Sequence, residues 1–329
     1  MKKWILLGAI FLVVLAVVVI WIRPAAPPPI QLPNPNGYDD LVKAGQMIVG
    51  DMPDCNWSQP DEECLEGMRN YVKANGEALK RARLGLSRES RIALNFTINT
   101  FSTHLPELAS IKRLAQMLNA EGRVAEEEGR IDNAIQSYVD TARLHEKFRG
   151  GVMIDELVGV IVEAIGVGSL RKLTDQMTTA QRRDLIQKLE RLYANRDSSK
   201  EIMANEKRYM NIYGLRGELT YLLTFSARNK YEREFQARRD FSRARLGLFL
   251  VDLALRNFRS ENGHPPKTLQ GLVPKYLPFL PKDDFSGKDF IYLPSTNSYK
   301  IYGVGSDRKD NGGKPFVTTG NSSPGDMLP

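Results

Sequence analysis

The segment FSRARLGLFLVDLALRNFRSENG, residues 241–263, carries the most regular apolar pattern of the chain. Its apolar side chains recur at steps of three and four residues, the spacing of one face of an α-helix. They are Phe241, Ala244, Leu248, Val251, Leu255 and Phe258. Asn262 and Gly263 form a favourable left-handed cap, and Pro265 and Pro266 cannot continue a helix. We therefore predict an amphipathic helix that ends at Asn262.

Two short runs of aromatic and branched residues follow this helix. Residues 290–293 (FIYL) and 299–302 (YKIY) have the composition of β-strands. Residues 294–297 (PSTN) between them favour a turn. We expect a β-hairpin that lies on the helix.

The same region resembles a known family. It contains ALRNFRSENGHPPKTLQGLV, then LPKDDFSGKDFIY, then YKIYGVGSDRKDNGG. These runs look like the soluble region of the major pseudopilin of type II secretion systems, over about residues 243–313. The resemblance implies a helix packed on a small antiparallel sheet, with a structural calcium ion in the last loop held by aspartates and backbone carbonyl groups. Asp307 and Asp310 match the acidic positions of that loop.

The chain departs from the pseudopilin family in its earlier part. A pseudopilin has a cleavable leader and a glutamate five residues into its apolar helix, whereas no such glutamate follows Gly8. A long helical region also separates the N-terminus from the region of resemblance. The complete arrangement is similar to membrane-anchored bacterial proteins of unassigned function. We therefore expect a pseudopilin-like α+β module with a disordered tail over residues 239–329, and not simply a pilus subunit.

Helical periodicity dominates residues 37–238, which we expect to form an extracytoplasmic helical domain. Two apolar stripes flank Gly129 and predict two antiparallel neighbouring helices. They consist of Leu108, Ile111, Ala115 and Leu118, and of Ile131, Ala134, Tyr138 and Ala142. With Gly122, their spacings resemble a tetratricopeptide unit, in which small residues let helices approach and an aromatic ring fills the gap. Because no second copy can be aligned, a generic helical hairpin is favoured over a solenoid.

The segment from Met153 to Leu170 is the most apolar outside the N-terminus. Three carboxylates interrupt it, and each is costly inside a bilayer, so we predict a buried core helix and not a second membrane span. They are Asp155, Glu156 and Glu163. Gly159, Gly166 and Gly168 suit close helix packing. Thr178 and Gln181 then form a capping-box pattern that predicts the start of another helix.

Residues 196–245 interleave basic side chains with tyrosines and phenylalanines. That mixture is typical of proteins that bind single-stranded nucleic acid or a polyanion. Acidic residues are interspersed, however, and the aromatic residues fall close to helical spacing. We therefore predict a long amphipathic helix or a helix pair and no nucleic-acid partner, with contact to anionic lipid or polymer as the alternative.

An uninterrupted apolar segment, residues 4–22, lies near the N-terminus. Its nineteen residues span about 28 Å as a helix, roughly the hydrocarbon thickness of a bilayer. We predict a single-pass anchor over residues 1–23, followed by a stiff proline-rich linker over residues 24–36. Lys2 and Lys3 favour a cytoplasmic N-terminus, which places the rest outside the bacterial inner membrane, in the periplasm. A cleaved signal peptide is the alternative.

Cys55 and Cys64 are the two cysteines of the chain. In an oxidising compartment they predict one disulfide. A metal site is the alternative, but the three histidines are scattered singly through the sequence. The surrounding residues 51–66 are acidic and predict a solvated loop, or else a loop that binds a cation or a basic partner.

No motif of a nucleophilic, metal-dependent or phosphate-binding enzyme occurs in the chain. Carboxylate pairs such as Asp283 and Asp284 suit a turn as well as acid–base chemistry. The net charge of +7 suits anionic envelope components as well as nucleic acid. We expect a non-enzymatic envelope protein whose helical domain binds a protein partner. The alternatives are an assembly component related to type II secretion or pili, and a cell-envelope hydrolase.

Overall fold

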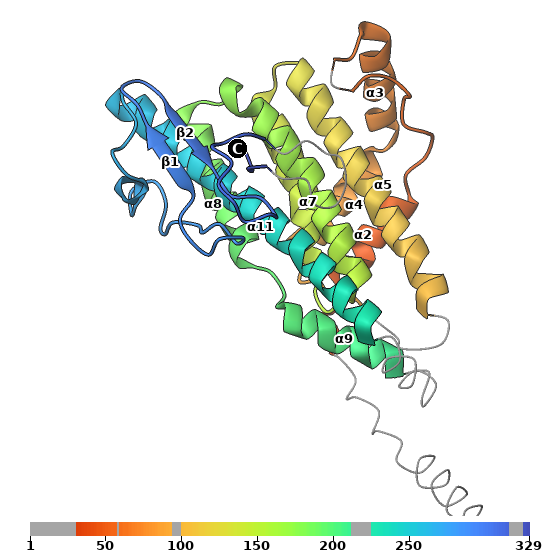
Figure 1. The fold of residues 1–329 in the computed structure, drawn as a ribbon. Coiled ribbons are helices and arrows are strands. Elements are labelled where there is room, and N and C mark those ends of the chain that lie inside the picture. The colour runs from red at the N-terminus through yellow and green to blue at the C-terminus, as the bar shows by residue number, and fades with distance from the viewer. Residues whose placement is uncertain (1–30, 58, 94–99, 212–224, 316–324) are drawn as a thin grey trace, which may run out of the picture.

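The computed structural model describes residues 31–57, 59–93, 100–211, 225–315 and 325–329 (Figure 1). The chain is mainly helical with one two-stranded antiparallel sheet, as the sequence predicts. The elements in order are α2 (Gly37–Gln46), α3 (Glu62–Ala74), α4 (Gly76–Ser87), α5 (Thr100–Glu127), α6 (Ile131–Arg143), η1 (Leu144–Lys147), α7 (Met153–Leu173), η2 (Thr174–Gln176), α8 (Thr179–Ala194), α9 (Ser199–Asn211), α11 (Phe225–Asn262), η3 (Leu269–Leu272), β1 (Ile291–Pro294) and β2 (Tyr299–Tyr302).

Within these ranges, no helix combines the length and the apolar character that crossing a bilayer requires. The expected anchor, residues 4–22, lies outside the described residues. The apolar segment from Met153 is α7, a helix packed among other helices, so the prediction of a core helix is confirmed.

α5 and α6 form the helical hairpin that the sequence predicts. Gly129 has a φ of 70° in the turn between them, a conformation that glycine adopts without strain. A Cβ atom on Gly122 would lie 2.4 Å from Cε1 of the Tyr138 ring, so the missing side chain lets the helices approach. Tyr138 is 1% exposed and fills the gap. The predicted combination of a small residue and an aromatic ring is confirmed.

α7 lies at the centre of the helices and contacts α5, α6, α9 and α11. A Cβ atom on Gly159 would lie 2.3 Å from Cδ2 of His145, and one on Gly166 would lie 2.5 Å from the carbonyl oxygen of Tyr138. These two glycines therefore allow the close packing that we predict. The prediction for Gly168 is wrong, because a Cβ atom there would meet open space.

α2, α4 and α5 form a second core beside α7. α2 begins at Gly37, where the side chain of Asn36 accepts a hydrogen bond from the N–H of Tyr38. Gly45 lies against α5, since a Cβ atom there would be 2.2 Å from the carbonyl oxygen of Ser110. The buried side chains of this core include Tyr38, Leu41, Leu86, Ile111 and Leu118.

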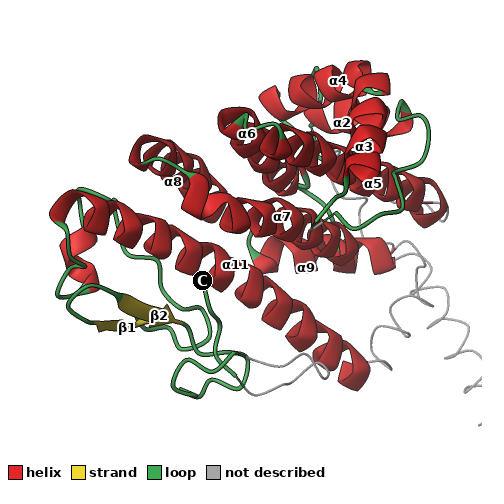
Figure 2. Ribbon diagram, turned by 90° about the horizontal axis from the view of Figure 1, so that it is seen from above, coloured by secondary structure: helices red, strands yellow, loops and turns green. Residues whose placement is uncertain are grey.

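α8 begins with the predicted capping box, in which Thr178 and Gln181 exchange hydrogen bonds. Residues 196–245 contain α9 and the first half of α11, while the segment between these helices lies outside the described residues. α11 ends at Asn262, and Gly263 after it has a φ of 77°, as the cap predicts. Figure 2 shows α7 and α8 between α11 and the group of α2 to α6.

β1 and β2 form the predicted hairpin. Ile291 lies opposite Tyr302, and Pro294 lies opposite Tyr299. The hydroxyl group of Tyr299 donates a hydrogen bond of 2.8 Å to Asp252 of α11. The hairpin therefore lies on the helix, as we expect from the sequence.

One hydrophobic core joins the C-terminal region to α6, α7 and α8. It includes Leu170, Leu189, Leu248, Phe290 and Met327. α11 crosses the expected boundary between residues 238 and 239 without a break, so the boundary falls inside one helix. Met327 and Asp326 form β-bridges with Gly303 and Pro315. The prediction of a disordered tail is therefore wrong for residues 325–329, because Met327 is an apolar side chain that the core buries.

Candidate functional site

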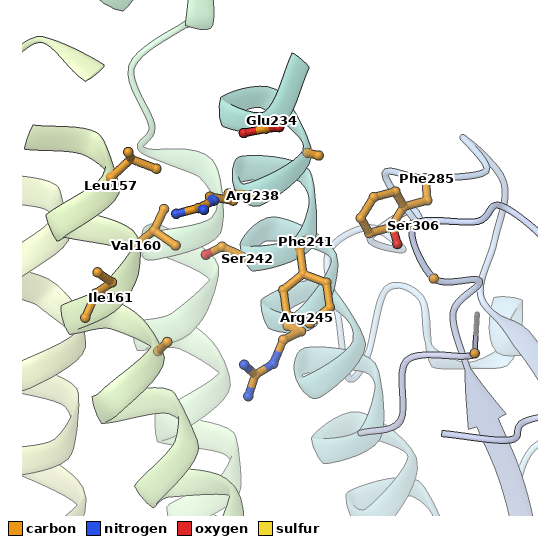
Figure 3. A pocket seen from close by; sticks show the side chains of 14 residues that line it. Leu157, Val160, Ile161, Glu234, Arg238, Phe241, Ser242, Arg245, Phe285 and Ser306 are labelled. Carbon is orange, nitrogen blue, oxygen red and sulfur yellow. The ribbon is translucent and has the colours of Figure 1, made fainter. Parts of the chain in front are cut away.

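A groove of about 390 Å³ lies between α7, α11 and the C-terminal loops (Figure 3). Most of its lining is apolar. The lining includes Leu157, Ile161, Phe241, Phe285, Arg238 and Arg245. We refer to this feature as the α7–α11 groove.

The α7 wall of the groove consists of Leu157, Val160, Ile161 and Ala164, which share one helical face. Ile161 is 48% exposed, and it is informative because it belongs to this contiguous apolar face and is not a single exposed aliphatic side chain. The cause is the composition of α7, which is apolar on most of its circumference and buries its other faces against α5 and α6. One apolar face therefore stays open beside α11.

The α11 wall adds an aromatic ring and two arginines. The Phe241 ring lies edge-on to Phe285 at 6.5 Å between ring centroids, and the Arg245 guanidinium lies 5.6 Å from the centre of the Phe241 ring. Burial lowers the pKa of Arg245, so water solvates this cation poorly. Neither Arg238 nor Arg245 forms an ion pair with a described residue. Among the described lining residues, Glu234 carries the negative charge.

A buried network of charged side chains lies beneath the groove. His145 of η1 hydrogen-bonds Glu163 through Nδ1 (2.8 Å) and Glu156 through Nε2 (3.1 Å), both on α7. Arg239 of α11 pairs with Glu156 at 2.7 Å, and Arg196 pairs with Glu163 at 2.6 Å. The hydroxyl group of Ser242, which also lines the groove, donates to Glu163 at 2.7 Å.

The network holds its charges firmly. Burial alone would lower the pKa of His145, but the hydrogen bonds to Glu156 and Glu163 outweigh burial and raise it to about 9. Burial alone would raise the pKa of Glu156, yet His145 and Arg239 lower it to about 2. His145 and Glu156 therefore both carry charge near neutral pH, which suits a structural role better than proton transfer.

His104 of α5 is held in a similar way, between Glu107 and Asp155. The sequence shows these histidines as scattered singly, and the structure gives each of His104 and His145 two carboxylate partners. In the part of the chain that the structure describes, no three His, Cys, Asp or Glu side chains are arranged to hold a metal ion.

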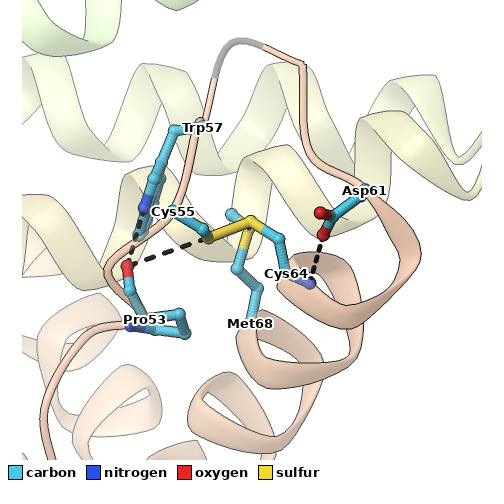
Figure 4. Close-up of a disulfide and its surroundings, with 6 residues drawn as sticks. All are labelled: Pro53, Cys55, Trp57, Asp61, Cys64 and Met68. Carbon is cyan, nitrogen blue, oxygen red and sulfur yellow. Dashed lines mark hydrogen bonds between the residues drawn. A yellow bond between two sulfur atoms is a disulfide. The ribbon is translucent and has the colours of Figure 1, made fainter.

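Cys55 and Cys64 form the predicted disulfide (Figure 4). The expectation of a solvated loop over residues 51–66 is wrong for residues 62–66, because α3 begins at Glu62. Asp61 accepts a hydrogen bond of 2.8 Å from the N–H of Cys64 and caps the helix. Acidic side chains stabilise a helix N-terminus, which explains why acidic residues are concentrated here.

Asp307 and Asp310 lie in one loop, but their carboxylates already accept hydrogen bonds. Asp307 accepts from the N–H of Lys309 at 3.1 Å, and Asp310 accepts from the N–H of Gly312 at 2.8 Å. The buried carboxylate of Asp326 holds the same loop through the N–H groups of Asn311 and Gly313. Among the described residues, these carboxylates are not arranged as a set of calcium ligands. The calcium site stays a prediction.

Calcium binding is tested by melting the full chain in detergent with millimolar calcium or with a chelator. If Asp307 and Asp310 hold calcium, the ion raises the melting temperature by linkage. Asp307→Ala with Asp310→Ala should abolish the rise, while the exposed control Asp289→Ala should retain it. Superimposable melting curves with calcium and chelator would leave an ordinary loop organised by Asp326.

Sequence reasoning identified the disulfide but missed the groove and the charge network. The three carboxylates within the apolar segment of α7 were a usable signal, since buried charges require partners. No family model, no curated protein and no solved structure matches this chain. The resemblance to pseudopilins therefore stays a prediction.

Proposed function

We propose that the protein is a membrane-anchored, extracytoplasmic, non-enzymatic interaction protein whose α7–α11 groove binds a partner protein. The observation that carries this proposal is the combination of an open apolar face with two arginines that form no ion pair with any described residue. Apolar contact supplies binding energy, and charge complementarity supplies specificity.

The groove chemistry defines the partner segment. Leu157, Ile161 and Phe241 fit apolar side chains, as in complexes in which an amphipathic helix lies in an apolar groove. Arg238 and Arg245 fit carboxylates at the edge of the same segment. We infer an amphipathic segment with aliphatic or aromatic residues on one face and aspartate or glutamate beside them.

A second candidate function is assembly with components of type II secretion systems or pili. The hairpin on the C-terminal half of α11 favours it, because the resemblance implies a helix with a small antiparallel sheet. In that case the partner segment belongs to a pseudopilin. The same groove experiment covers both candidates, since the partner that is cross-linked identifies the assembly.

The groove is tested by photo-cross-linking from position 161 in the full chain in native membranes. We expect one predominant cross-linked protein with a segment of the stated composition. Ile161→Asp places a charge on the apolar wall and should reduce copurification of that protein at least about tenfold, the usual effect at the centre of an interface. Arg238→Glu with Arg245→Glu should also weaken it and reduce its salt dependence.

The matched control is Leu84→Asp, because Leu84 is 43% exposed and lies on α4, away from the groove. This variant should copurify the partner at the wild-type level. Equal loss in Leu84→Asp and Ile161→Asp, or a partner segment without acidic residues, would contradict the proposal.

A further inference from the structure

A second cavity, of about 630 Å³, lies where the described chain begins. One wall is the segment between α4 and α5, and the other is η1 with the segment before α7. Gln31, Leu32 and Pro33 also line it. Its lining contains five cationic side chains, Arg88, Arg91, Arg143, Lys147 and Arg149, against two carboxylates, Glu89 and Glu146. The larger excess of positive charge distinguishes this cavity from the α7–α11 groove, whose lining has two arginines and one carboxylate.

The two walls are fixed relative to each other. The N–H of Ile92 donates to the carbonyl oxygen of Arg149 at 2.9 Å, and the hydroxyl group of Ser90 donates to the carbonyl oxygen of Lys147 at 2.9 Å. Lys147 reaches back to the carbonyl oxygen of Arg88 at 2.7 Å. The two backbone segments that carry the cationic side chains are thus held together by hydrogen bonds, which lowers the cost of ordering them around a ligand.

Two of the five cations have close acidic partners. Arg88 pairs with Asp40, and Arg143 lies 3.6 Å from Glu146 and 3.8 Å from Asp140. Together, the other three have fewer ion pairs with described residues. Arg91 has one ion pair at 3.8 Å, with Glu201, and its buried Nε has no hydrogen-bond partner. Arg149 forms no ion pair with a described residue, and Lys147 donates to a carbonyl oxygen only.

Burial and the neighbouring cations act in the same direction on Lys147. Burial first, and then the charges of Arg143 and Arg149, lower the pKa of this amine, while the charges of Glu146 and Glu89 partly oppose them. An anion among these side chains would relieve the repulsion and replace the lost solvation. Phosphate suits them best, because its several oxygens accept from planar guanidinium groups in pairs and from an ammonium group as a point charge.

We propose that Arg91, Lys147 and Arg149 form a binding site for a phosphate-bearing anion. Two sources offer this chemistry, the headgroup of an anionic phospholipid and a soluble phosphate. The membrane source rests on the proposed anchoring: the nine steps from Ile22 to Gln31 could span at most about 32 Å even if fully extended, which is short enough for the cavity to approach the bilayer surface. Anionic lipid surfaces attract basic clusters that come within about one Debye length, about 8–10 Å, of the headgroups.

The test uses the full chain in uncharged detergent micelles, at constant ionic strength maintained with sodium chloride. One arm adds inorganic phosphate, and the other adds phosphatidylglycerol to the micelles. Acetylation of Lys147 by acetic anhydride, followed by mass spectrometry of the peptide, reports occupancy of the site. We expect at least one of the two probes to slow acetylation of Lys147 severalfold and to leave Lys267, an exposed lysine of the C-terminal region, unchanged.

Arg149→Glu is the diagnostic variant, because the Arg149 side chain is exposed and its removal breaks no described ion pair. The concentration of probe needed for half protection should rise at least about tenfold, while the melting temperature stays near the wild-type value. Lys267→Glu changes the net charge equally and should bind as the wild type does.

The pattern of protection assigns the source. Protection by phosphatidylglycerol alone identifies a lipid headgroup, protection by inorganic phosphate alone identifies a soluble phosphate, and protection by both identifies a site that recognises the phosphate group itself. Absence of protection in both arms, or equal weakening by Arg149→Glu and Lys267→Glu, overturns the proposal. Neither result bears on the α7–α11 groove, whose test depends on Ile161.

Discussion

Glu163→Ala should lower the free energy of unfolding by about 3–5 kcal/mol, one of the two largest effects that we expect from a single substitution. Glu163 is 3% exposed and accepts hydrogen bonds from His145, Arg196 and Ser242. Its removal leaves two buried cationic groups without their shared carboxylate. The penalty exceeds the worth of the ion pairs because His145 and Arg196 cannot regain water.

Chemical denaturation of the full chain in detergent measures this loss. Glu77→Ala is the matched control, because Glu77 forms an exposed pair with Lys80 on α4, and such pairs contribute at most about 1 kcal/mol. We expect the control to stay within about 0.5 kcal/mol of the wild type. Equal small effects for both variants would show that water enters the network and that the cluster is not a dry structural centre.

Gly166→Ala should destabilise the protein by about 1–3 kcal/mol or more, although alanine is the better helix former. The added Cβ atom would lie 2.5 Å from the carbonyl oxygen of Tyr138 and 2.6 Å from the backbone nitrogen of Ala142. Both atoms belong to the backbone of α6, which cannot turn aside as a flexible side chain does. α6 and α7 must therefore separate.

Gly168→Ala on the same helix provides the control, because a Cβ atom at Gly168 meets open space. This substitution should stabilise the protein by about 0.5–1 kcal/mol through the greater helix propensity of alanine. The opposite signs at positions two residues apart form the prediction, and thermal or chemical unfolding of both variants measures them. Destabilisation by Gly168→Ala similar to that by Gly166→Ala would mean that the interface of α6 and α7 differs from the one described.

The helices were predictable because their information is local. The stripe from Phe241 to Phe258, the capping box of Thr178 and Gln181, and the cap at Gly263 each depend on residues within a few positions of one another. The pairing of Gly122 with Tyr138 was also predictable, since one turn brings the two helices together. Local spacing could not separate Gly168 from Gly166, because the difference depends on how α6 packs: Gly166 lies against the backbone of α6, whereas Gly168 faces open space.

The groove and the charge network were not predictable for the opposite reason. His145, Glu163 and Arg239 lie far apart in sequence and meet only when η1, α7 and α11 pack. Sequence spacing can reveal a group of interacting residues when they lie close together in the chain, as Cys55 and Cys64 do. The role of Asp326 was not predictable for the same reason. Asp326 lies 15 residues from Asn311 and 13 residues from Gly313 in sequence, and it contacts their loop only in the folded protein.

The continuity of α11 has a mechanical consequence. A helix of 38 residues is about 57 Å long and stiff. Tyr299 binds its C-terminal half, whereas Phe241 lies in the groove and Arg239 in the charge network. A force applied to the hairpin would be transmitted along this continuous helix, because no break in α11 provides a hinge. Such a force would move the α11 wall of the groove relative to α7. Tension on the hairpin would therefore change how the groove binds a partner.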